Sequence, residues 1–223
     1  METSVKRVRR SKEAARASYN RMSRWYDVIA GSTEKKYRDQ GLEKLSAQPG
    51  EKILEIGFGT GHALVSLAKA VGPSGRVIGL DISEGMLAVA QKHLQKEGLA
   101  DRVDLHLGDA ARMSFLEPGS LDGVFMSFTL ELFDTPEIPL VLAECRRFLK
   151  PDGRLVVVSM TKTEPPGLPV RMYEWFHDHA PEYADCRPIF AKQALEQSGF
   201  RIESVDRSSM WGLPVETVLG RKS

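Results

Sequence analysis

The sequence predicts an α/β fold in which helices cover both faces of a mostly parallel sheet. Short apolar runs that read as strands alternate with longer segments of helical periodicity along most of the chain. Clusters of glycine and proline, which are typical of turns, separate these segments. Because parallel strands need crossover connections, the alternation indicates right-handed β–α–β units.

The chain has 223 residues, enough for one large α/β domain or two small ones. Its hydrophobic content of 42% can fill a sizeable core, and its net charge of +1 gives no general argument for a nucleic-acid or acidic partner. No apolar run reaches the length of a membrane span, and basic residues 1–18 lack the apolar stretch of a secretory signal. Cys145 and Cys186 lack metal-like spacing, so we expect reduced thiols, a cytoplasmic protein and no metal site.

Five strands are expected in the central part of the chain, each a short apolar run. The fifth run, RLVVVSM, is apolar enough to be buried on both faces of a sheet. The expected strands are residues 52–57, 76–81, 103–109, 121–128 and 154–160.

Helical segments connect these strands. One helix is expected over residues 61–71, and the next begins after an N-cap at Ser83 and stops at Gly98. Pro136 opens a third helix, which ends near Leu149 before a turn over residues 150–153.

The two ends of the chain depart from this regular alternation. Residues 11–46 look helical, with breaks at Gly31 and Gly41. Residues 161–189 are rich in proline and aromatic residues and interrupt the rhythm; a helix over 190–198 and strands near 201–207 and 216–220 follow. We therefore expect a single domain, 1–223, with four parts: a helical cap (1–48), a core (49–160), an insertion (161–189) and a C-terminal helix with strands (190–223).

A glycine-rich loop lies between the first strand and its helix, in the stretch ILEIGFGTGHAL, residues 53–64. Gly57, Gly59 and Gly61 make a backbone that a ligand can approach closely, and the following helix presents free N–H groups. The second and third strands end in Asp81 and Asp109. Since ligands of open α/β sheets bind beyond the carboxyl ends of the strands, these residues predict a nucleoside site, with Asp81 on the ribose hydroxyls.

The spacing of the glycines favours one nucleoside cofactor over another. Dinucleotide enzymes favour G-x-G-x-x-G, whereas this loop reads G-x-G-x-G. Glu55, two residues before the first glycine, would sit badly beside a pyrophosphate but suits a cofactor that is cationic on that side. S-adenosyl-L-methionine, with its ammonium and sulfonium groups, is therefore favoured. A nicotinamide-dependent oxidoreductase and a binding protein without catalysis remain as alternatives.

Several further stretches carry a resemblance to a known family. The motifs ILEIGFGTG, GLDIS, LGDAARMSF, DGVFMSFTLELF and LKPDGRLVVVSM resemble successive motifs of class I S-adenosylmethionine-dependent methyltransferases. Within that family the chain is most similar to the ubiquinone/menaquinone-biosynthesis type, whose N-terminal Tyr-Asp pair matches Tyr26 and Asp27. The resemblance implies a Rossmann-like, seven-stranded, mostly parallel sheet whose last strand is antiparallel.

The resemblance also implies where the cofactor binds. The glycine loop would hold the methionine end, Ile82 one face of the adenine, and Asp109 with Ala110 the adenine edge. Ser127 and Phe128 would border the transferred methyl group. The predicted cofactor-binding residues are Tyr26, Glu55, Gly57, Phe58, Gly59, Gly61, Asp81, Ile82, Met86, Gly108, Asp109, Ala110, Ser127 and Phe128.

The methyl acceptor is expected to be a small molecule, either phenolic, quinol or lipid-like. The aromatic insertion would form its wall, and His177, His179, Tyr26 and Asp27 are candidates for removing a proton from it. No one of them stands out as the catalytic residue. Methyl transfer to RNA or protein is an alternative, although the Asn-Pro-Pro-Tyr type of signature for base amino groups is absent after the fourth strand.

Two further charged groups allow more than one interpretation. Glu131 and Asp134 lie close to the end of the fourth strand, where they could contact substrate, although Asp134 could equally cap the next helix. The basic run Lys6–Arg16 is typical of a solvated face, with weak attraction to an anionic membrane surface or RNA as its functional interpretation. The sequence carries no signal for the oligomeric state.

Overall fold

The structure is a computed structural model that describes residues 7–8, 10–23, 32–162, 170 and 187–223. Tyr26, Asp27, His177 and His179 lie outside the described residues, as does most of the predicted insertion. Predictions that concern those positions therefore stay predictions.

Seven strands form one sheet in the order β3-β2-β1-β4-β5-β7-β6. The first five strands pair in parallel, and β7 runs antiparallel to both of its neighbours. The predicted Rossmann-like sheet is thus confirmed. The strands are β1 (Lys52–Ile56), β2 (Arg76–Asp81), β3 (Val103–Leu107), β4 (Leu121–Ser127), β5 (Leu149–Met160), β6 (Phe200–Met210) and β7 (Leu213–Lys222).

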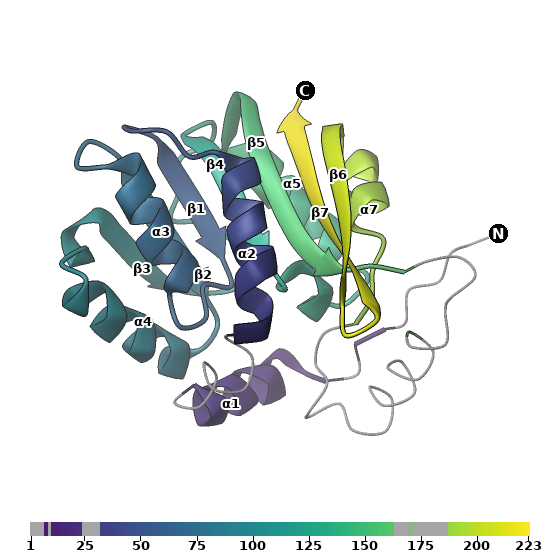
Figure 1. Ribbon diagram of the computed structural model, residues 1–223, viewed down its shortest axis with the longest axis horizontal. Helices are drawn as coiled ribbons and strands as arrows, with labels where there is room; N and C mark the ends of the chain where they lie inside the picture. The colour runs from purple at the N-terminus through teal and green to yellow at the C-terminus, as the bar shows by residue number, and fades with distance from the viewer. Residues whose placement is uncertain (1–6, 9, 24–31, 163–169, 171–186) are drawn as a thin grey trace.

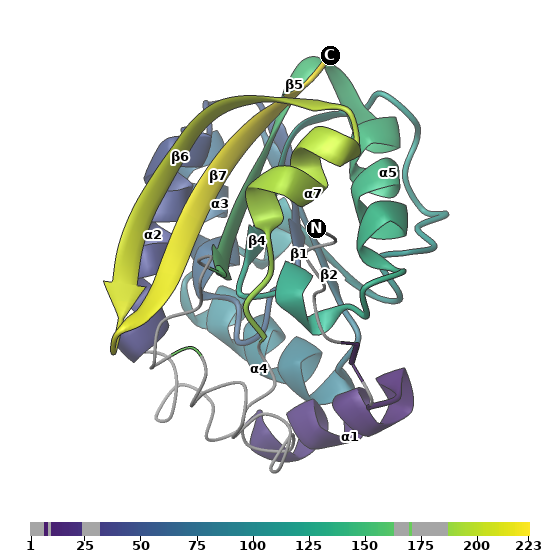
Figure 2. The same ribbon diagram turned by 90° about the vertical axis from the view of Figure 1, so that its right-hand side faces the viewer.

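Helices cover both faces of this sheet (Figures 1 and 2). Helices α2, α3 and α4 pack on one face, and α5 and α7 pack on the other. Alternate residues of β1 enter the two apolar layers: Ile53 lies in one and Leu54 in the other, both fully buried. The helices are α1 (Lys12–Met22), α2 (Ser32–Leu45), α3 (His62–Val71), α4 (Glu84–Lys96), α5 (Ile138–Phe148) and α7 (Ala191–Gln197), with short 3₁₀ turns η2 (Ala100–Arg102) and η3 (Leu130–Leu132).

Some element boundaries differ from the predictions. The predicted break at Gly41 is wrong, because Gly41 lies inside α2. A Cβ at this position would lie 2.5 Å from Val158 Cγ2 and 3.0 Å from the ring of Phe125, so the glycine lets α2 approach the sheet. The expected turn over residues 150–153 is an irregularity within β5, where the pairing register shifts and Asp152 has a φ of +59°.

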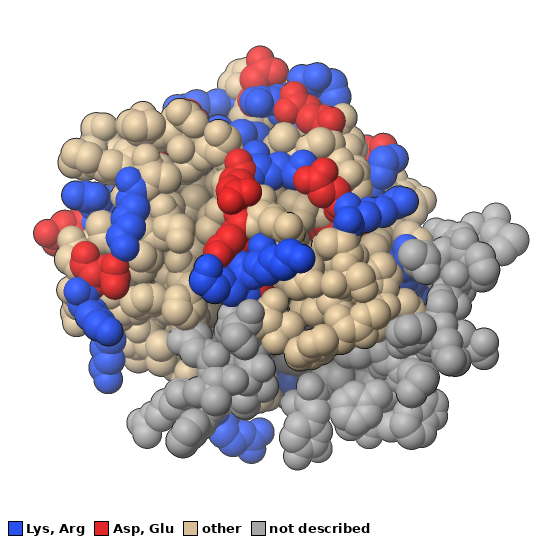
Figure 3. Space-filling view, in the orientation of Figure 1, with Lys and Arg blue, Asp and Glu red and all other residues tan. Residues whose placement is uncertain are grey.

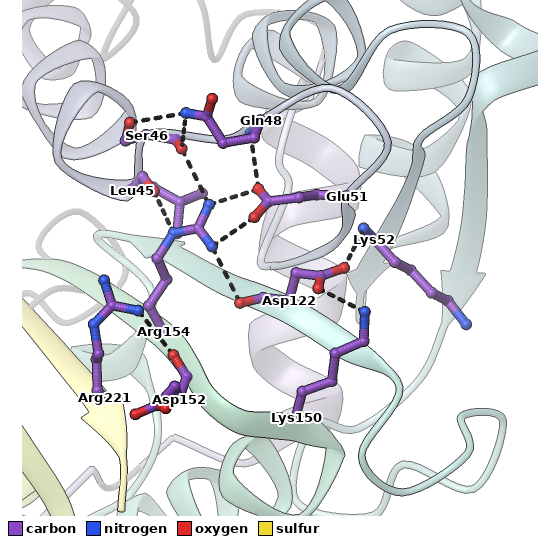
Figure 4. A network of polar contacts seen from close by, with 10 residues as sticks. All are labelled: Leu45, Ser46, Gln48, Glu51, Lys52, Asp122, Lys150, Asp152, Arg154 and Arg221. Carbon is purple, nitrogen blue, oxygen red and sulfur yellow. Dashed lines mark hydrogen bonds and ion pairs between the residues drawn. The ribbon is translucent and has the colours of Figure 1, made fainter.

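A polar network fastens the amino ends of the central strands to the end of α2 (Figure 4). The guanidinium of Arg154 donates to both carboxylate oxygens of Glu51, at 2.6 and 2.9 Å, and to the carbonyl of Ser46. Nearby, Asp122 accepts hydrogen bonds from the Lys52 N–H and the Lys150 ammonium, at 2.9 and 2.6 Å. These contacts stabilise the fold at the amino ends of the strands. The carboxyl ends of the parallel strands lie at the opposite end of the sheet.

Candidate active site

The loop between β1 and α3 has the backbone that its glycines predict. Gly57, Gly59 and Gly61 have φ values of +72°, +52° and +85°, a region that side chains disfavour. A Cβ on Gly57 would lie 2.4 Å from the side chain of Thr129, and one on Gly61 would lie 3.0 Å from the Cβ of Ala90. Nothing lies within 4 Å of a Cβ on Gly59. The loop is therefore packed tightly on two sides and left open at its centre.

Asp81, at the end of β2, organises this loop. Its carboxylate accepts hydrogen bonds from the Gly59 N–H at 3.0 Å and from the Ser83 N–H at 2.9 Å. Burial raises the pKa of Asp81, and the N–H donors act against that rise. The predicted N-cap is confirmed, because Ser83 Oγ accepts from the Met86 N–H at 3.1 Å. Asp81 thus links the glycine loop to the start of α4.

A cavity of about 200 Å³ lies at the carboxyl ends of the central strands. It is bounded by the glycine loop, by the ends of β2 and β4, and by the loop after β3. Most of the predicted cofactor-binding set lines it. The predicted residues on its wall are Gly57, Gly59, Asp81, Ile82, Met86, Gly108, Asp109, Ala110, Ser127 and Phe128.

Three other predicted residues are not on the wall of this cavity. Phe58 is buried, with its ring against the position of Gly79, and Gly61 contacts α4. Glu55 is buried in the sheet, where loss of solvent raises its pKa and the charge of Arg38 on α2 lowers it. Its Oε2 has no hydrogen-bond donor among the described residues. The contact of Glu55 with the cofactor therefore stays a prediction.

The N-terminal segment forms a wall of the cavity that the sequence did not predict in detail. The Lys12 ammonium lies 2.5 Å from both Asp109 Oδ2 and Glu137 Oε1. The Arg7 guanidinium donates to both oxygens of Asp134 at 2.8 Å, and the pKa of that carboxyl falls to about 2 mainly because of this bond. Arg7 stays exposed, with 66% of its side chain accessible, as expected of a solvated face, whereas Lys12 is partly buried between two carboxylates. The described residues of this segment on the wall are Arg7, Val8, Arg10, Ser11, Lys12, Ala15 and Tyr19.

Helix α1 is held across the carboxyl edge of the sheet (Figure 1). Asn20 Oδ1 accepts hydrogen bonds from Ser83 Oγ at 2.6 Å and from the Gly85 N–H at 2.9 Å. A Cβ on Gly85 would lie 2.8 Å from the Cα of Asn20, so this glycine permits the close approach of the two helices. Because Ser83 also binds Asp81, α1 is connected to the predicted ribose-binding carboxylate.

An aromatic corner lies at the end of β4. Phe128 is buried, lines the cavity and has a φ of +51°, which for a residue other than glycine costs about 1–2 kcal/mol. Its N–H donates to the Val158 carbonyl at 2.8 Å, and its ring meets that of Tyr37 edge to face at 6.2 Å. The fold therefore holds the ring of Phe128, on a backbone with an unfavourable positive φ, at the place where the methyl group is predicted to be transferred.

Glu131 is a buried carboxyl that follows this corner. It has no exposed surface, and its Oε1 accepts from the Met160 N–H at 3.1 Å. Burial raises its pKa to about 8, and its Oε2 has no hydrogen-bond donor among the described residues. Glu131 does not line the cavity, so the structure does not show the substrate contact considered from the sequence. Asp134 instead accepts from Arg7, Val8 and Thr135.

Comparisons with known proteins identify the class. A family model described as a methyltransferase domain matches residues 53–153. Demethylmenaquinone methyltransferase from Lactobacillus johnsonii is 34% identical over 178 residues, which cover 78% of this chain and 68% of that protein. The enzyme of the same name from Bacillus velezensis is 31% identical over 197 residues, covering 88% and 80%. A solved S-adenosylmethionine-dependent methyltransferase from Aquifex aeolicus superposes with a TM-score of 0.63 at 23% identity, covering 83% and 89%.

The chain therefore belongs to the class I S-adenosylmethionine-dependent methyltransferases. It is an enzyme of that class, and S-adenosylmethionine is its cofactor. Within the class, the curated relatives compared above are demethylmenaquinone methyltransferases. The nicotinamide-dependent oxidoreductase considered from the sequence is excluded by this membership. In the described part of the chain, no helix is long and apolar enough to cross a membrane, and no cluster of three His, Cys, Asp or Glu residues is placed to hold a metal ion.

Two glycines with open surroundings allow the glycine loop to be tested. Gly59 and Gly98 have positive φ values, and a Cβ on either would meet nothing within 4 Å, but only Gly59 lines the cavity. We expect Gly59→Ala and Gly98→Ala each to lower the free energy of unfolding by about 1–2 kcal/mol. Only Gly59→Ala should also weaken binding of S-adenosylhomocysteine, measured by calorimetry. Equal affinity in the two variants would show that the cofactor does not approach the centre of the loop.

Proposed function

We propose that this enzyme transfers a methyl group to a small phenolic or quinol acceptor of apolar character. The observation that carries the proposal is the aromatic corner of Phe128 and Tyr37 beside Ser127, at the end of the cavity predicted to face the methyl group. Buried aromatic rings suit stacked or edge-to-face contact with the flat ring of an acceptor. The names of the two curated relatives, which refer to a demethylated menaquinone, also support a quinol.

The residues of this chain would act mainly by alignment. When bound, S-adenosylmethionine supplies an activated methyl group, so the protein has to orient the acceptor in line with the sulfur and exclude water. Asp81, Ile82 and Asp109 would hold the nucleoside, as the resemblance implies. The N-terminal segment, which already lines the cavity, would close it from solvent.

A phenol or quinol becomes nucleophilic when its hydroxyl loses a proton, so a nearby base would assist the reaction. His177, His179, Tyr26 and Asp27 remain the proposed candidates. A base among these four should, when replaced, lower turnover and shift its pH dependence, while leaving cofactor affinity nearly unchanged.

The proposal is tested with methyl-labelled cofactor and a panel of acceptors. We expect transfer to a chemically reduced demethylmenaquinone analogue with a short prenyl chain and no transfer to its oxidised quinone, which lacks the hydroxyl. Transfer to an RNA or protein pool but to no quinol or phenol would contradict the proposal. The surface in Figure 3 argues against RNA, because Lys and Arg are interspersed with Asp and Glu on the visible face.

A further inference from the structure

The turn between β6 and β7 contains an exposed tryptophan in an unfavourable backbone conformation. Trp211 and Gly212 connect the paired residues Met210 and Leu213, and their φ values are +52° and +81°. A two-residue turn with both φ values positive normally takes asparagine, aspartate or glycine first, and a bulky residue there costs about 1–2 kcal/mol. Trp211 is also 79% exposed. Neither local conformation nor packing accounts for this residue.

The turn lies at the same end of the sheet as the candidate active site, where the parallel strands have their carboxyl ends (Figure 1). The Thr161 N–H, just after the end of β5, donates to the Pro214 carbonyl at 2.9 Å. The Tyr37 hydroxyl donates to the Ser209 carbonyl at 2.6 Å, and the ring of Tyr37 contacts Phe128 on the cavity wall. Two contacts thus connect the tryptophan turn with the end of the cavity that is predicted to receive the acceptor.

Two exposed cations lie near the turn. Lys36 is exposed, with its ammonium 5.9 Å from the centre of the Tyr37 ring, and Arg207 is exposed on β6. Neither has a carboxylate within ion-pair distance among the described residues. By contrast, Arg7 and Lys12 of the basic N-terminal run are engaged with carboxylates at the cavity. Lys36 and Arg207 are therefore two exposed cations near the turn that an external partner can reach.

We propose that Trp211 docks the enzyme on a lipid membrane surface, with its indole in the headgroup region and Lys36 and Arg207 toward anionic lipid. Indole rings prefer this interface because they are apolar with one polar N–H. The inference rests on the proposed apolar acceptor, since docking places the acceptor end of the cavity beside the phase in which such a molecule dissolves. It explains why an exposed aromatic residue occupies a turn position better suited to asparagine.

Vesicle binding tests this surface without any acceptor. We expect the protein to co-sediment with vesicles of phosphatidylcholine and phosphatidylglycerol in equal amounts, and Trp211→Asn to lower the partition coefficient about tenfold, the value of burying most of a large apolar side chain. The matched control is Leu140→Asn, since Leu140 is 55% exposed but lies on α5, on the other face of the sheet. Equal losses in the two variants, or no binding by the native protein, would overturn the proposal.

Two further measurements separate docking from other roles. Asparagine tolerates a positive φ, so Trp211→Asn should unfold at the same temperature as the native protein or at a higher one. A lower unfolding temperature would identify Trp211 as a folding contact and overturn the proposal, as would a native dimer that Trp211→Asn dissociates. Turnover of a water-soluble quinol should not change, whereas turnover of a vesicle-embedded quinol should fall. If no quinol is methylated but vesicle binding depends on Trp211, only the proposed function fails.

Discussion

The Asp81→Ala variant should bind S-adenosylmethionine about 1–3 kcal/mol more weakly than the native enzyme, which is about 5- to 150-fold in the dissociation constant. Two effects contribute. The variant loses the carboxylate predicted to accept from the ribose hydroxyls, and it leaves the N–H groups of Gly59 and Ser83 without their acceptor. Calorimetric titration of both proteins with S-adenosylmethionine measures the total loss of binding free energy.

A thermodynamic cycle that combines the Asp81→Ala variant with a modified ligand separates these two effects. Native enzyme and Asp81→Ala are each titrated with S-adenosylhomocysteine and with its 2′-deoxy analogue. If Asp81 binds the ribose, removal of the hydroxyl weakens binding to the native enzyme and has much less effect on the variant. If removal of the hydroxyl weakened binding equally in both proteins, Asp81 would only stabilise the glycine loop, and its predicted contact with the ribose would be contradicted.

The features predicted best from the sequence depend on residues close together in the chain. The glycine loop, Asp81 and the Ser83 cap all lie within or beside one β–α–β unit, where strand ends and helix starts have recognisable patterns. The resemblance to the family implies seven strands with an antiparallel last strand, whereas the order β3-β2-β1-β4-β5-β7-β6 is a finding of the structure. Periodicity alone gives the elements without their order in the sheet.

The features missed depend on distant residues meeting in space. Lys12 and Asp109 are 97 positions apart, and Arg7 and Asp134 are 127 positions apart. A run of basic residues looks the same in sequence whether it faces water or a cavity rich in carboxylates. The sequence does not predict the role of Gly41 for the same reason, because its close contacts are with strands β4 and β5, far along the chain.

Glu131 should make the stability of the native protein depend on pH, and Glu131→Gln should remove that dependence. The pKa of this carboxyl is about 8 in the folded protein, against an ordinary value of 4.5. Between these values the folded state keeps a proton that the unfolded state has lost, so the free energy of unfolding falls as pH rises from about 4.5 to about 8 and is level above. The total fall is on the order of 5 kcal/mol.

Glutamine is neutral at every pH and keeps an oxygen that can accept from the Met160 N–H. Its extra N–H donors lower stability by an amount that does not change with pH. Urea unfolding from pH 5 to pH 9 should therefore show the variant gaining stability relative to the native protein as pH rises. Glu117→Gln, at an exposed position, is the control and should follow the native curve. Parallel curves for Glu131→Gln and the native protein would show that Glu131 is ionised when folded and would contradict the raised pKa of this buried carboxyl.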